Sequence, residues 1–141
     1  MTLYFDTSLL VALLTREPRT EEIERWLAAQ TPGVGATSNW VVSEFSAALS
    51  AKVRAKVLQP FERADSLAAF SRLRRDSLTL FPITEEYFVE AARLADRDVV
   101  GLRAGDALHA AIAAANHSTL CTLDRGMAKA SIALGIPTIM V

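Results

Sequence analysis

The chain has 141 residues, a formal net charge of -1 and a hydrophobic fraction of 51%. This length favours one compact domain, residues 1–141, with enough apolar material for a core. The near-neutral charge excludes a global attraction to nucleic acid, so any such binding needs a local basic patch. No apolar run approaches the ~20 residues of a membrane span, and Asp6 interrupts the only N-terminal stretch that resembles a signal peptide. With a single cysteine, Cys121, we expect a soluble cytoplasmic protein without disulfides.

The first predicted elements are a buried strand over residues 3–5 and a helix over residues 7–15. Asp6 lies between them and has two interpretations. It is either the N-cap of the helix or a ligand at the carboxyl end of the strand, where open α/β sheets bind their ligands. For Asp6 alone, both interpretations stay open.

Helices and short strands then alternate along the rest of the chain. Helices are predicted to begin at Thr20, at Ser38 or Asn39, near residue 61, at Thr84, at Asp106 and at Met127; strands are predicted over 34–37, 78–83, 119–123 and 136–141. Strands that alternate with helices indicate an α/β fold with a mainly parallel central sheet, here of about five strands. A long helical insert between the second and third strands is the one irregularity.

Four acids are distinguished by their positions. Asp6 and Asp124 each follow a predicted strand, Asp106 opens a helix, and Glu44 lies near the apolar side of the helix that starts at residue 39. Taken singly, the three aspartates are explained as caps and Glu44 as a helix-face residue. However, the carboxyl ends of parallel strands meet at one edge, and a cluster of like charges there must be neutralised. A hard divalent cation such as Mg²⁺ is held by carboxylate oxygens in this way.

Several nearby polar residues have two interpretations each. Ser8 and Thr122, each two residues from an acid, would either hydrogen-bond the carboxylates around a metal or cap the chain locally. His109 follows Asp106 by three residues; we favour packing in the core, with orientation of a carboxylate or contact with RNA as the alternative. Six basic residues form either a phosphate-binding patch or a solvated helix face: Lys52, Arg54, Lys56, Arg72, Arg74 and Arg75.

The acids lie within four short motifs: Tyr4-Phe5-Asp6-Thr7-Ser8, Ser43-Glu44-Phe45, Gly105-Asp106-Ala107-Leu108-His109-Ala110-Ala111 and Thr122-Leu123-Asp124. In order and spacing, over essentially the whole chain, these motifs resemble the PIN domain, and most closely the VapC-type toxins of bacterial toxin–antitoxin pairs. The resemblance implies a PIN-like three-layer α/β/α sandwich formed by a single PIN domain.

The same resemblance implies a function for the acids. Asp6, Glu44, Asp106 and Asp124 match the acidic quartet of a metal-dependent endoribonuclease, with Mg²⁺ as the cofactor and Mn²⁺ as a substitute, and Ser8 matches a polar position near the metal. Such a toxin acts on RNA, inhibits translation and growth, is inhibited by a VapB-like antitoxin, and frequently forms a homodimer.

Two other functions were weighed against a nuclease. A non-catalytic RNA- or protein-binding module would use the acids only to hold a structural ion, and an activity assay with metal distinguishes it. An aspartyl-nucleophile phosphatase similar to the haloacid dehalogenases would need a second aspartate two residues after the first, where this chain has Ser8.

The helices beside the acids carry apolar residues that are expected to be exposed in so small a domain: Leu13, Leu14, Trp26 and Leu27. Exposed apolar patches usually mark an interface. The sequence therefore predicts that these helices form a homodimer or antitoxin surface.

Overall fold

The computed structural model describes residues 1–141 and contains a single sheet of parallel strands. The strand order is β3-β2-β1-β4-β5, so the N-terminal strand lies at the centre of the sheet. The strands are β1 (Leu3–Phe5), β2 (Gly35–Ser38), β3 (Thr79–Phe81), β4 (Thr119–Thr122) and β5 (Thr138–Met140). The predicted α/β class, with a parallel sheet of about five strands, is therefore confirmed.

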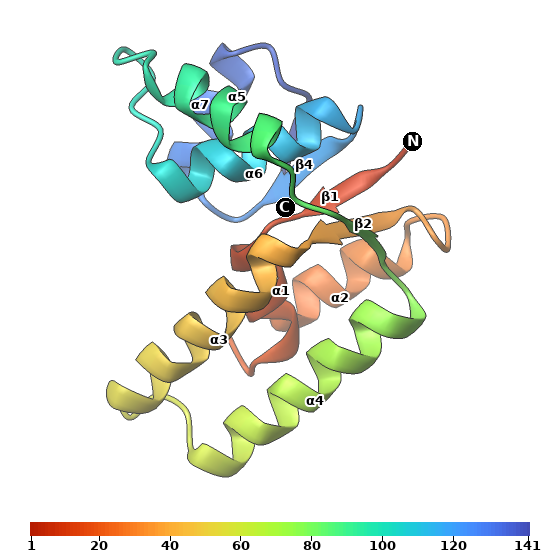
Figure 1. Cartoon of the computed structure of the whole chain (residues 1–141). Helices are drawn as coiled ribbons and strands as arrows, with labels where there is room; N and C mark the ends of the chain where they lie inside the picture. Colours follow the sequence, from red (N-terminus) through yellow and green to blue (C-terminus); the bar gives the residue numbers. More distant parts are fainter.

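Helices cover both faces of this sheet. They are α1 (Thr7–Leu14), α2 (Thr20–Ala28), α3 (Asn39–Arg54), α4 (Pro60–Asp76), α5 (Glu85–Ala95), α6 (Ala104–Ala115) and α7 (Arg125–Ala133). Figure 1 shows α1 to α4 on one side of the strands and α5 to α7 on the other. This is the predicted three-layer α/β/α sandwich, and the long insert between β2 and β3 is the helical pair α3 and α4. No helix is both long and apolar enough to span a membrane.

The alternation of side chains along β1 creates two separate cores. Successive side chains of a strand point to opposite faces of the sheet. Leu3 and Phe5 therefore join the core on the side of α1 to α4, where Phe45 of α3 stacks on Phe70 of α4 with ring centroids 4.3 Å apart. Tyr4 joins the core on the side of α5 to α7. Both faces of the central strand are buried, and its C-terminal end is fixed between two helical layers.

The apolar residues that were expected to be exposed are packed against the first core. Leu13, Leu14, Trp26 and Leu27 are only partly accessible, and the Trp26 ring contacts Phe5 edge-on at a centroid distance of 6.1 Å. The prediction of an apolar patch there was wrong because α1 packs against α2, α3 and α4 together. The sequence pattern predicted the helices themselves, but it did not show that α2, α3 and α4 pack around α1.

Candidate functional site

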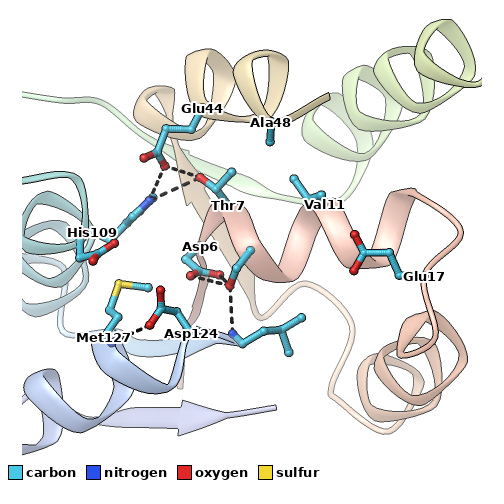
Figure 2. Close-up of a pocket in the computed structure, with 12 residues that line it drawn as sticks. Asp6, Thr7, Val11, Glu17, Glu44, Ala48, His109, Asp124 and Met127 are labelled. Carbon is cyan, nitrogen blue, oxygen red and sulfur yellow. Dashed lines mark hydrogen bonds and ion pairs between the residues drawn. The ribbon is translucent and has the colours of Figure 1, made fainter. Parts of the chain in front are cut away.

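A pocket of about 440 Å³ lies beside the carboxyl ends of β1 and β4. The four acids singled out in the sequence, Asp6, Glu44, Asp106 and Asp124, all line it. Figure 2 labels three of them, Asp6, Glu44 and Asp124, around one opening. They are delivered by the end of β1, by α3, by α6 and by the end of β4, so residues more than a hundred positions apart are brought together. As predicted, adjacent parallel strands place Asp6 and Asp124 at the same edge of the sheet.

Asp6 is the most enclosed of the four, with 2% of its surface exposed. Its Oδ1 accepts a hydrogen bond from the backbone N–H of Leu9 (3.0 Å), which caps α1. The hydroxyl of Ser8 lies 2.8 Å from both carboxylate oxygens, and Thr122 Oγ1 donates to Oδ2 at 2.6 Å. Burial raises the pKa of Asp6, while the nearby His109 and these hydrogen bonds oppose the rise. Asp6 is thus both a helix cap and a wall of the pocket.

Asp124 and Asp106 stand at the N-terminal ends of two helices. Asp124 caps α7 by accepting a hydrogen bond from the backbone N–H of Met127 at 2.9 Å. Asp106 does not open its helix as predicted, because α6 begins two residues earlier, at Ala104. No donor hydrogen-bonds the half-buried Asp106 carboxylate. Burial and the neighbouring charge of Asp124 raise the pKa of Asp106. No hydrogen bond within the protein stabilises its ionised form.

Glu44 projects from α3 and is held by partners on two other helices. Its Oε2 accepts a hydrogen bond from Thr7 Oγ1 of α1 and lies 2.6 Å from His109 Nε2 of α6. Partial burial works against ionisation, but the hydrogen bonds with His109 and Thr7 hold the pKa of Glu44 below its ordinary value. Glu44 is therefore not a simple helix-face residue. His109 is only 2% exposed, as core packing predicts, and its ring also contacts the Glu44 carboxylate.

Two polar lining residues, Thr7 and Glu17, were missed in the sequence. Thr7 directly follows Asp6, and this adjacency was the available signal. Glu17 follows α1 and carried no signal, because its place in the pocket depends on how the chain turns back after that helix. Glu17 pairs with Lys52 Nζ at 2.5 Å, so this member of the predicted basic patch instead neutralises an acid. Figure 2 shows Glu17 near Val11, apart from the other acids.

The pocket is strongly acidic without being a preformed metal cage. Its twelve lining residues include five acids and no lysine or arginine. Nevertheless, no three His, Cys, Asp or Glu side chains in the structure are arranged to hold a metal ion as they stand. Mg²⁺ is usually bound through only one or two carboxylates, together with waters and substrate phosphate. The donor set fits such an ion best at Asp106, which has no hydrogen-bond partner, and at Asp124, whose Oδ2 has none.

A model of the PIN domain family matches residues 3–133, which include all four acids. The chain belongs to the PIN domain family. All four acids of the pocket at the carboxyl end of the sheet lie within the matched part of this PIN domain. A comparison with curated proteins gave no match.

Solved structures share the fold of this PIN domain. The Mycobacterium tuberculosis toxin VapC20, described as cleaving the sarcin-ricin loop, is 22% identical with a TM-score of 0.75, over 99% of this chain and 98% of that one. VapBC2 from Rickettsia felis, bound to a DNA fragment from its promoter, is 19% identical with a TM-score of 0.68, over 99% of this chain and 98% of that one. A chain of a toxin–antitoxin complex from Klebsiella pneumoniae is 18% identical with a TM-score of 0.60, over 88% of this chain and 87% of that one. At these identities the likeness establishes the shared fold.

Proposed function

We propose that this PIN domain is a metal-dependent endoribonuclease and the toxin of a type II toxin–antitoxin pair, which hydrolyses RNA phosphodiester bonds and thereby inhibits translation and growth. The observation that carries the proposal is a pocket with five acids and no lysine or arginine. An RNA phosphate is itself an anion, so it is repelled from this pocket unless a cation neutralises the carboxylates. Membership of a family of nucleases and the structural likeness to VapC20 support the same function.

In this proposal the residues of the pocket divide the work. Asp6, Glu44, Asp106 and Asp124 hold Mg²⁺, for which Mn²⁺ can substitute. When bound, the ion stabilises charge on the phosphoryl group and activates water. Asp106 is better suited than Asp6 to orient the attacking water, because both oxygens of Asp6 already accept hydrogen bonds.

A non-catalytic binding module, whose acids would hold only a structural ion, is the second candidate. A phosphatase with an aspartyl nucleophile is disfavoured, because Asp6 is buried and both its oxygens are hydrogen-bonded. The deciding experiment incubates purified protein with total RNA in MgCl₂ or in chelator and maps the new RNA ends. Ends that arise only with metal support the nuclease. Binding of RNA without new ends, in either buffer, supports the module.

We expect Glu44→Gln to reduce growth arrest on induced expression and to weaken the metal dependence of cleavage. The substitution keeps the shape of the side chain and removes the negative charge of the carboxylate that contacts His109 and lines the pocket. Growth curves after induction compare wild type with Glu44→Gln, and Glu90→Gln on the exposed side of α5 is the matched control. Equal arrest by Glu44→Gln and wild type would remove Glu44 from the site.

We further propose that the protein forms a homodimer and binds a VapB-like antitoxin that covers the pocket. For these two contacts we propose an apolar surface other than the one expected from the sequence. A groove of about 240 Å³ lies between α5 and α6 and is bordered by Trp40, Phe88 and Gly105, the last of which adjoins Asp106. We expect light scattering at micromolar concentration to give the mass of a dimer, and the product of the adjacent reading frame to increase it. A monomer mass that this product leaves unchanged contradicts both contacts.

A further inference from the structure

A buried chain of polar side chains leads from the central strand to the pocket. The hydroxyl of Tyr4 in β1, a residue with no exposed surface, lies 2.7 Å from Ser38 Oγ and 3.0 Å from His109 Nδ1. The other ring nitrogen of His109 lies 2.6 Å from Glu44 Oε2, to which Thr7 also donates. Side chains from β2, β1, α6, α3 and α1 therefore meet in one network.

Each group in this network has one consistent role. An ionised carboxylate only accepts hydrogen bonds, so Glu44 requires a proton on His109 Nε2. In a neutral imidazole Nδ1 is then an acceptor, which suits a donating Tyr4 hydroxyl, whose oxygen accepts in turn from Ser38. Connected hydrogen bonds of this kind rigidify the groups that they join.

The network occupies only one of the two oxygens of Glu44. Oε2 takes both hydrogen bonds, whereas Oε1 takes none within this network. The indole of Trp40 helps to lower the pKa of Glu44, but its N–H forms no hydrogen bond. Oε1 lies so close to Gly105 that a Cβ added there would be 3.1 Å away. Since Gly105 directly precedes Asp106, the unbonded oxygen is held at the start of α6, beside the residue that also lacks a hydrogen-bond donor.

We propose that Tyr4 and His109 are positioning residues, which fix the Glu44 carboxylate so that its unbonded oxygen is presented to a divalent cation in the acidic pocket. This inference rests on the proposed function, because it assigns Glu44 to the cation site. Tyr4 acts on Glu44 through the imidazole. Residues that orient a metal ligand in this manner typically change metal affinity or activity by roughly 10- to 100-fold when they are replaced.

The test compares His109→Leu, which removes the donor, with His109→Gln, which can restore a donating N–H, and with Tyr4→Phe, which keeps the ring. The control is Ser66→Ala in α4, which removes a buried hydroxyl that donates to the carbonyl of Leu14 and does not line the acidic pocket. Mn²⁺ affinity is measured by electron paramagnetic resonance without RNA, and kcat and KM with RNA. We expect His109→Leu to lose roughly 10- to 100-fold in Mn²⁺ affinity and in kcat, with KM little changed. His109→Gln should recover part of both, Tyr4→Phe should show a smaller loss, and Ser66→Ala should show none.

The proton on the imidazole gives an independent readout. The chain has two histidines, and His117→Asn leaves His109 as the only one. We expect the imidazole nitrogen NMR spectrum of this variant to show the proton on Nε2. A bare Nε2, wild-type Mn²⁺ affinity in His109→Leu, or an equal loss in Ser66→Ala would overturn the inference.

The two proposals fail in different ways. If the wild-type protein binds Mn²⁺ but cleaves no RNA, the nuclease proposal fails, and the affinities of the variants still decide the role of Tyr4 and His109. If the wild-type protein binds no Mn²⁺, both proposals are overturned.

Discussion

Replacing Asp106 by asparagine is expected to abolish RNA cleavage while leaving the fold intact. Asp106 lies in the first turn of α6, half-buried in the pocket, and no protein donor contacts its carboxylate. The substitution therefore removes a charge without breaking a hydrogen bond of the fold. Metal-derived stabilisation of a phosphoryl-transfer barrier is worth several kcal/mol, and each ~1.4 kcal/mol is tenfold in rate, so kcat should fall by at least roughly 10²- to 10³-fold.

The matched control is Asp98→Asn, which makes the same chemical change at an exposed position between α5 and α6. Rates of cleavage of a defined RNA in MgCl₂ are compared for the two variants and wild type, with circular dichroism as the check on folding. Asp98→Asn should cleave like wild type. Near-wild-type cleavage by a folded Asp106→Asn protein, free of contaminating nuclease, would withdraw Asp106 from the catalytic assignment.

The meeting of Asp6 and Asp124 at one edge of the sheet could be predicted from the sequence, because each residue directly follows a short strand. The apolar run before Asp6 and the run before Asp124 are each short strands, and a parallel sheet carries the ends of both to one edge. The structure pairs Phe5 with Cys121 in adjacent parallel strands. Thr122 then hydrogen-bonds Asp6. The hydrophobic pattern, the positions of the strand ends and the alternation of strands with helices were sufficient to predict this part of the site.

The remaining contacts required knowledge of how helices pack, which the pattern of a single helix does not contain. The pairing of His109 with Glu44 joins α6 to α3 across the end of the sheet. The hydroxyl of Ser38, at the start of α3, bonds Tyr4 rather than its own helix. Likewise, the sequence predicted that Leu13 in α1 is exposed. The side chain is partly buried, because α1 packs against α2, α3 and α4. Local patterns therefore located the acids, while the partners of those acids and the enclosure of α1 depended on tertiary packing.

Mg²⁺ or Mn²⁺ is expected to raise the melting temperature, and Asp106→Asn to raise that of the metal-free protein. The raised pKa of Asp106, caused by burial and by the charge of Asp124, means that its ionised form costs stability at neutral pH when no cation is present. A ligand that binds only the folded state stabilises it by RT ln(1 + [L]/Kd), or about 2.7 kcal/mol at a hundredfold excess over Kd. For a domain of this size that corresponds to a shift of roughly 10 °C.

Asp106→Asn separates this shared-cation account from an isolated helix-terminal acid. If Asp106 shares a cation with the other acids, asparagine relieves the repulsion, so the metal-free variant melts higher than wild type and its response to MgCl₂ is smaller. If Asp106 only stabilises the first turn of α6, the substitution is neutral or mildly destabilising, and MgCl₂ acts only through salt screening. Thermal melts of both proteins in chelator, in MgCl₂ and in NaCl of matched ionic strength decide between these accounts. Equal shifts of the two proteins in MgCl₂ would refute a cation bound by Asp106, because a ligand cannot be lost without a change in the free energy of binding.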